Sequence, residues 1–197
     1  MYIIPIGIES IRISSHMART SNGSYHQGLD LVSFSEIAPN VIAAEAGVVS
    51  QVDFDADGYG NFAVVQHAND EYTLYGHMAE PAVVSAGANV SQGQLIGAMG
   101  STGNSSGRHL HFEIVVPPKP NDFWSSVPRW QFKKNPFLEV PAFSAASFGG
   151  QAEQAHQARR WIDAIVAGPA SGLSRSTVID KMVGSKTLAA ALVPIVT

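Results

Sequence analysis

The sequence predicts a mostly β fold, an antiparallel β-sheet domain followed by a C-terminal α-helical appendage. Short apolar or alternating runs, broken by turns, extend from Ile3 to about Val116. Glycine and proline are frequent (18 and 11 residues) and only 14% of residues are charged, which is typical of a loop-rich β protein. After Gly150 the apolar residues take helical spacing. A chain of 197 residues can bury one good core with a small appendage.

The N-terminal residues Met1–Glu9 resemble a first strand. They lack a basic start, a long apolar core and a small-residue cleavage site, so no signal peptide is predicted. No apolar run approaches the length of a membrane span, and a net charge of -4 gives no general attraction to nucleic acid. Without cysteine, any metal site must be built from imidazole and carboxylate groups.

Turn chemistry separates the predicted strands. Asp55–Gly58 reads as a turn between two strands, and Ser101–Gly107 as a glycine-serine loop that leads the chain to His109. The runs that predict strands are Val41–Glu45, Gly47–Phe54, Phe62–His67, Tyr72–Tyr75, Gln94–Met99 and His109–Val116.

The chain changes character after the last of these strands. Residues 117–150 hold six prolines and scattered aromatic residues, which indicates an irregular, packed segment. Two helices separated by Gly168-Pro169 are predicted beyond it. We therefore divide the chain into a β domain (1–138), a linker (139–150) and a helical appendage (151–197), for which packing on the β domain is favoured over an independent binding role.

Two histidine signatures indicate a metal site. They are His26-Gln-Gly-Leu-Asp30 and His109-Leu-His111. Residues two apart in a strand project from one face, so His109 and His111 are expected to point into the same pocket. Two imidazoles and one carboxylate leave a fourth tetrahedral position open, the arrangement of catalytic zinc. A lone His-x-His more often only satisfies hydrogen bonds, so the prediction depends on the combination.

The order of four motifs resembles the lysostaphin/LytM-type zinc endopeptidases of the M23 peptidase family. The resemblance covers roughly residues 1–138 and implies the fold of that family, a duplicated hybrid motif with a substrate groove. The motifs that carry it are His26-x-x-x-Asp30, Tyr75-Gly-His77, Gly100-Ser-Thr-Gly103 and His109-x-His111, with Asn135-Pro-Phe-Leu138 as the end of the domain.

The resemblance also implies a role for each matching residue. His26, Asp30 and His111 would hold Zn²⁺, and His77 and His109 would be the catalytic pair. One imidazole would take a proton from the zinc-activated water and the other would stabilise the oxyanion, with either assignment open. The substrates implied are peptide bonds in bacterial peptidoglycan, in cross-bridges or stem peptides. With no signal peptide predicted, we expect a phage-encoded or virion-associated lysin, or an excised domain, acting at the cell wall.

One segment departs from the compact members of the family. Residues 117–134 look like an insertion, and its Trp124, Trp130, Lys133 and Lys134 either border the groove or serve packing. No motif identifies the tyrosine that such enzymes often place near the groove.

Several other residues resemble catalytic or metal-binding groups but have simpler structural explanations. His67 is predicted to be a hydrogen-bonded structural histidine. The aspartates at 53, 55 and 57 resemble the start of a calcium loop, but Val64 stands where a glutamate is needed, so a polar hairpin turn is favoured. Glu153 and His156 fit a solvated helix face.

Two other functions compete with the enzyme. A catalytically silent relative could bind cell wall or activate a hydrolase, but such relatives typically lack a metal ligand, and here every candidate ligand is present. A biotinyl-, lipoyl- or phosphocarrier-like module is suggested by Gly87-x-x-Val90-x-x-Gly93 and by His26-x-Gly28-x-Asp30. The first two need a lysine at a hairpin tip that this chain lacks, and the phosphocarrier leaves His109-Leu-His111 unexplained.

Overall fold

The structure is a computed structural model. It describes residues 1–7, 11–19, 25–68, 70–117, 123–124 and 133–144. The predicted helical appendage, the second half of the predicted linker (145–150), and Trp130, Glu153 and His156 lie outside the described residues, so those predictions stay open.

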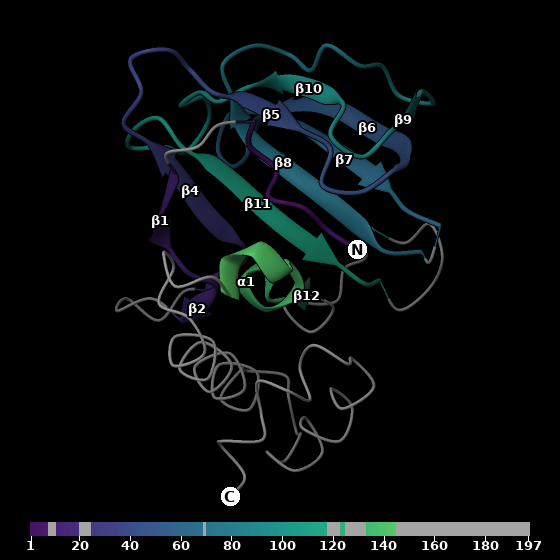
Figure 1. The fold of residues 1–197 in the computed structure, drawn as a ribbon. Helices are drawn as coiled ribbons and strands as arrows, with labels where there is room; N and C mark the ends of the chain where they lie inside the picture. Colours follow the sequence, from purple (N-terminus) through teal and green to yellow (C-terminus); the bar gives the residue numbers. More distant parts are fainter. Residues whose placement is uncertain (8–10, 20–24, 69, 118–122, 125–132, 145–197) are drawn as a thin grey trace, which may run out of the picture.

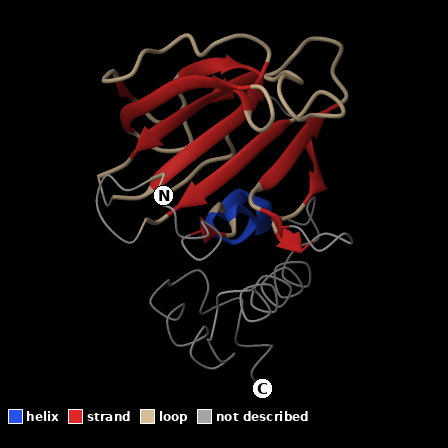
Figure 2. Cartoon of the chain, turned by 180° about the vertical axis from the view of Figure 1, so that it is seen from behind, coloured by secondary structure: helices blue, strands red, loops and turns tan. Residues whose placement is uncertain are grey.

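A broad antiparallel sheet dominates the described chain (Figures 1 and 2), which confirms the predicted mostly β fold. Its strand order is β1-β4-β11-β8-β7-β6-β9, with β12 also paired to β11. These strands are β1 (Ile11–Ser15), β4 (Leu29–Ser33), β6 (Gly47–Asp55), β7 (Gly60–Gln66), β8 (Tyr72–Met78), β9 (Asn89–Val90), β11 (Leu110–Val115) and β12 (Lys133–Lys134). Two small sheets pair β5 (Asn40–Ile42) with β10 (Leu95–Ala98), and β2 (Ala18–Arg19) with β3 (Tyr25–His26).

Strand alternation gives the broad sheet two different faces. In β11, Leu110 and Phe112 join the main hydrophobic core. His111 and Glu113 alternate with these residues and point to the opposite face of the sheet. Val115 lies on that face too and packs in a second, smaller apolar cluster. The polar side chains of β11 therefore share one face of the sheet.

Most predicted strands are found, with shifted ends. β8 continues past Tyr75 to Met78, and β5 ends at Ile42. The N-terminal residues run beside β5 and form a bridge between Ile6 and Val41, but no full strand. Pro5 has no N–H to donate, which interrupts the ladder that a first strand would need. β1 and β4 were not among the predicted runs.

The core extends past the predicted domain end at residue 138. The side chain of Asn135 caps helix α1 (Pro136–Glu139), accepting a hydrogen bond from the Phe137 N–H at 3.1 Å. The short 3-10 helix η2 (Pro141–Ser144) follows, and Val140 and Phe143 are fully buried in the main core. Two apolar side chains from beyond residue 138 therefore pack with the strands of the sheet.

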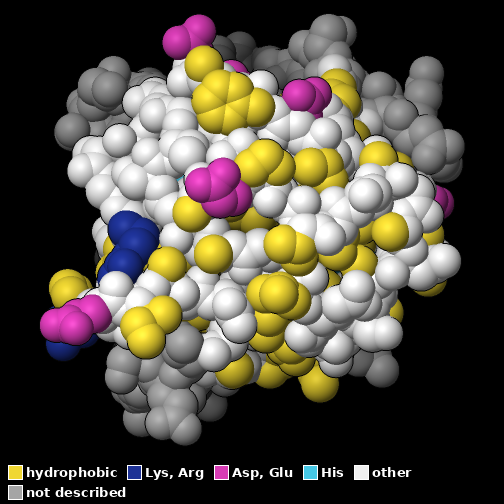
Figure 3. Space-filling view, turned by 90° about the horizontal axis from the view of Figure 1, so that it is seen from above, with side chains coloured by type: hydrophobic (Ala, Val, Ile, Leu, Met, Phe, Trp, Pro, Cys, Tyr) yellow, Lys and Arg dark blue, Asp and Glu magenta, His cyan; other side chains and the backbone are white. Residues whose placement is uncertain are grey.

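On the face seen in Figure 3, the charged side chains are few. Figure 3 also shows hydrophobic side chains spread between uncharged ones, and basic side chains near one side. Large exposed apolar residues include Phe34, Ile37, Phe54 and Val83. Within the described residues, no helix has the length and apolar character required to cross a membrane.

His67 is a structural histidine, as predicted. Its Nδ1–H donates to the Ala46 carbonyl at 2.9 Å, and its Nε2 lies 3.0 Å from the Thr73 hydroxyl. Burial lowers the pKa of His67, and the hydrogen bond to Ala46 only partly opposes this.

The pKa of His67 makes stability depend on pH. Because the folded-state pKa lies below the unfolded value of about 6.5, its contribution is present above about pH 6.5 and is lost as pH falls towards the folded-state pKa. We expect the wild type to lose unfolding free energy relative to His67→Gln between about pH 7 and pH 5. Urea unfolding of both proteins across this range measures the difference, and a pH-independent difference would contradict the prediction.

Candidate active site

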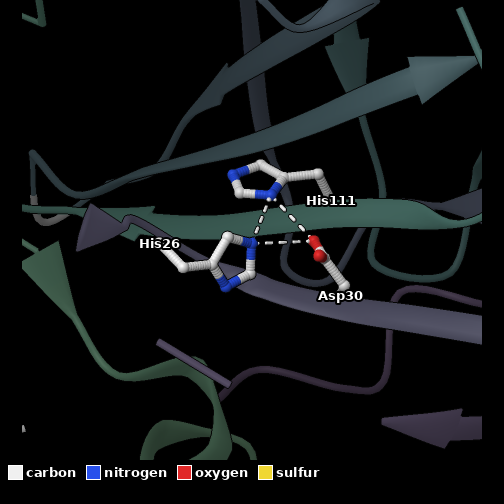
Figure 4. A group of neighbouring side chains, drawn as sticks. All are labelled: His26, Asp30 and His111. Atoms are coloured by element: carbon white, nitrogen blue, oxygen red, sulfur yellow. Dashed lines mark hydrogen bonds and ion pairs between the residues drawn. The ribbon is translucent and has the colours of Figure 1, made fainter. Parts of the chain in front are cut away.

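The first part of the site is a cross-strand pair. Asp30 in β4 lies directly opposite His111 in β11, and His26 comes from β3 just before β4. Figure 4 shows the three side chains converging on one point. The carboxylate Oδ1 of Asp30 is 2.9 Å from His111 Nδ1 and 3.0 Å from His26 Nε2, and the two nitrogens are 3.2 Å apart. We name these residues the His/Asp cluster.

The donor atoms of the His/Asp cluster fit a metal ion. All three lie within 4.8 Å of one another. Ligand atoms bound tetrahedrally to zinc at about 2.0–2.1 Å are about 3.3 Å apart, close to the separations found here. The other ring nitrogen of His26, Nδ1, lies 3.0 Å from the carbonyl of His16. A carbonyl only accepts, so Nδ1 carries a hydrogen, and Nε2 is the atom that faces the cluster and would offer its lone pair to a bound metal.

His111 is held in a similar way by a carboxylate. Its Nε2 lies 3.0 Å from Oε1 of Glu113, which leaves Nδ1 facing Asp30 and His26. Glu113 is fully buried and paired with Lys133. A carboxylate behind a metal-binding imidazole orients the ring and raises its basicity.

The charges of the cluster depend on its hydrogen bonds. Burial opposes ionisation of Asp30, but hydrogen bonds from His111 and His26 outweigh it and hold the pKa of this carboxyl below its usual range. Burial also opposes a charged His111, yet Asp30 and Glu113 raise its pKa to about 9. A metal therefore has to displace a proton from His111 in the metal-free protein.

Two more imidazoles complete the site. His77 Nδ1–H donates to the Thr102 carbonyl at 2.8 Å, and His109 Nδ1–H to the Gly107 carbonyl at 2.8 Å. Both acceptors belong to the glycine-serine loop, which thus orients both rings and leaves each Nε2 without a hydrogen in the neutral form. The ring centroids are 4.6 Å apart, and His109 Nε2 is 3.7 Å from Asp30 Oδ1.

The backbone turns sharply at His77. Its φ of +61° lies in the left-handed region, which is uncommon for a residue other than glycine, and its N–H donates to the Tyr59 carbonyl at 2.7 Å. Burial lowers the pKa of His77 to about 4, although its hydrogen bond to Thr102 acts in the other direction. The ring is therefore neutral at pH 7.

One pocket of about 450 Å³ contains all five predicted site residues in its lining. Tyr59, Asp55 and Ser105 also line it, and none of the three was predicted to be a site residue. Trp124 and Lys133, both in the described part of the segment 117–134, do not border this pocket. Trp124 contacts the rings of Phe62 and Phe123, and Lys133 is buried.

The glycine-serine loop rests on the hairpin between β6 and β7. Gly103 has a φ of +71°, and a Cβ there would lie 2.2 Å from the Gly60 nitrogen. We expect Gly103→Ala to lower the unfolding free energy by at least about 1 kcal/mol, since a side chain must adopt the left-handed conformation and displace the hairpin. Gly107→Ala is the matched control, because a Cβ there meets nothing within 4 Å. Denaturant unfolding measures both, and equal stabilities would contradict the prediction.

The sheet order, the His/Asp cluster and two imidazoles in one pocket define a candidate hydrolytic metal site. Residues 24–123 match Peptidase family M23, so the chain belongs to this family and the predicted resemblance is confirmed. The chain is also similar to the catalytic domain of lysostaphin from Staphylococcus simulans, with a TM-score of 0.54, 25% identity, and coverage of 68% of this chain and 92% of that one.

Two curated relatives are similar to part of the chain. The chain is 39% identical over 91 residues to an uncharacterized metalloprotease of Haemophilus influenzae, covering 46% of this chain and 18% of that protein. It is 36% identical over 91 residues to the peptidoglycan DD-endopeptidase ShyC of Vibrio cholerae, covering 46% and 20%. The match therefore spans about a fifth of the length of these relatives.

Proposed function

We propose that this chain is a zinc-dependent endopeptidase that hydrolyses peptide bonds in bacterial peptidoglycan. One observation carries the proposal: the donor atoms of His26, Asp30 and His111 converge within 4.8 Å in a pocket that His77 and His109 also line. Membership of the M23 family and the similarity to ShyC, a peptidoglycan DD-endopeptidase, support it. The phage-encoded or virion-associated setting stays a prediction.

The residues of the pocket account for the proton movements of hydrolysis. Bound zinc would supply a Lewis acid that acidifies water and polarises the scissile carbonyl. As the water oxygen bonds to the carbonyl carbon and the C–N bond breaks, one proton has to move from water to the leaving nitrogen. Nε2 of His77 or His109 can accept and return it, because each ring keeps its other hydrogen at Nδ1. The second imidazole can stabilise the negative charge on the carbonyl oxygen when its Nε2 also carries a hydrogen, that is, in the imidazolium form.

Digestion of purified peptidoglycan tests the proposal. The zinc-loaded protein should release fragments with new amino termini, which mass spectrometry identifies for several peptidoglycan chemotypes, and a chelator should stop the reaction. Stoichiometric zinc without new termini would favour the catalytically silent relative, and a protein that binds no zinc would overturn the proposal.

A further inference from the structure

A buried charged network stands behind the His/Asp cluster. The two oxygens of the Glu113 carboxylate have different partners: Oε2 pairs with Lys133 Nζ, whereas Oε1 accepts a hydrogen bond from the Tyr59 hydroxyl at 2.8 Å and lies 3.0 Å from His111 Nε2. The side chains of Glu113 and Lys133 are fully buried. Each carboxylate oxygen is therefore held by its own partners, and the carboxylate cannot turn away from His111 without breaking its ion pair with Lys133.

Strand register explains why Lys133 reaches this carboxylate. β12 pairs with β11 so that Lys133 lies opposite Val115 and Lys134 opposite Ile114. Side chains of opposite residues share a face, so Lys133 projects to the face of Glu113 and His111. Lys134 projects to the other face, where its Nζ is 2.5 Å from Glu71.

We propose that Glu113, held by Lys133, is a positioning residue for the metal site. It fixes the His111 ring with Nδ1 towards Asp30 and His26, and it makes that nitrogen a stronger metal ligand. A buried ion pair is a costly way to gain stability, since apolar residues of similar size often serve as well. The inference rests on the proposed function, because the orientation of His111 matters only if the cluster binds a metal.

The zinc dissociation constant, measured by chelator competition, tests the inference. We expect Lys133→Met and Glu113→Gln each to weaken zinc binding by roughly 10- to 100-fold, the usual effect of losing a partner behind a metal-binding histidine. Lys134→Met is the matched control. It removes the neighbouring lysine and its ion pair with Glu71, which lies on the other face of the sheet from the cluster. It should leave the zinc affinity unchanged. Equal affinities for Lys133→Met and the wild type, or equal losses for both lysine variants, would overturn the inference.

A double variant keeps the test valid if Lys133→Met does not fold. Glu113→Gln combined with Lys133→Met removes both charges and keeps an oxygen beside His111, so the protein should fold and bind zinc more weakly than the wild type. Long-range ¹H–¹⁵N spectra of the zinc-loaded wild type should show the His111 hydrogen on Nε2 and the metal on Nδ1. Wild-type affinity in the double variant, or metal on Nε2, would refute the inference. A wild type that binds no zinc would refute the proposed function instead.

Discussion

Replacing His111 by alanine is expected to abolish zinc binding and peptidoglycan hydrolysis together. His111 Nδ1 is one of only three donor atoms in the His/Asp cluster, and Asp30 and His26 alone make a weak two-ligand site. The substitution also leaves Glu113 and Lys133 buried beside a cavity, so the folded state has to be checked separately by thermal unfolding. Metal content after dialysis and release of new amino termini are the two measurements.

The matched control for His111→Ala is a change at His109, which lies immediately before β11 and lines the same pocket. His109→Ala removes an imidazole from the same pocket, but His109 Nε2 lies 3.7 Å from Asp30 Oδ1 and outside the cluster. This variant should keep one zinc per chain and lose turnover. Stoichiometric zinc in His111→Ala, or its loss in His109→Ala, would show that the ligand set is misassigned.

Strand alternation was enough to predict part of this site. It placed His109 and His111 together, and the structure shows Leu110 and Phe112 on the opposite, core-facing side. The same alternation continues to Glu113, so its position behind His111 could have been found from the sequence. The predicted hairpin turn at Asp55–Gly58 also agrees with the ends of β6 and β7.

Other contacts have no local signal in the sequence. Lys133 pairs with Glu113 from a proline-rich stretch of the sequence in which no periodicity predicts β12. The carbonyls of Thr102 and Gly107 orient two imidazoles, but a backbone carbonyl is common to every residue and so leaves no trace in composition.

For His77, strand alternation predicts the wrong direction of the side chain. By alternation it should share the face of Tyr75, which is buried in the main core. The positive φ at His77 redirects the chain, and its ring enters the pocket instead. Only the resemblance to the M23 family placed His77 at the site, since a single left-handed residue at a strand end cannot be read from an apolar pattern.

Replacing His77 by alanine is expected to leave zinc in place and lower kcat by roughly 100- to 10,000-fold, the usual contribution of a general acid–base group. The ring is buried and neutral at pH 7, with Nδ1–H held by the Thr102 carbonyl. Its remaining nitrogen, Nε2, can therefore accept a proton. Among the described residues, His109 is the one other imidazole that lines the pocket without belonging to the cluster. Zinc content and steady-state hydrolysis of a defined peptidoglycan fragment measure the two effects separately.

The left-handed backbone at His77 requires a second variant. Alanine is strained at a φ of +61°, whereas asparagine adopts this region more readily, so His77→Asn separates loss of the imidazole from loss of the turn. Both variants should show the same large fall in kcat if the imidazole moves the proton. If His77→Asn kept wild-type turnover while His77→Ala did not, the residue would matter for its backbone alone, and His109 would have to carry the proton from water to the leaving nitrogen by itself.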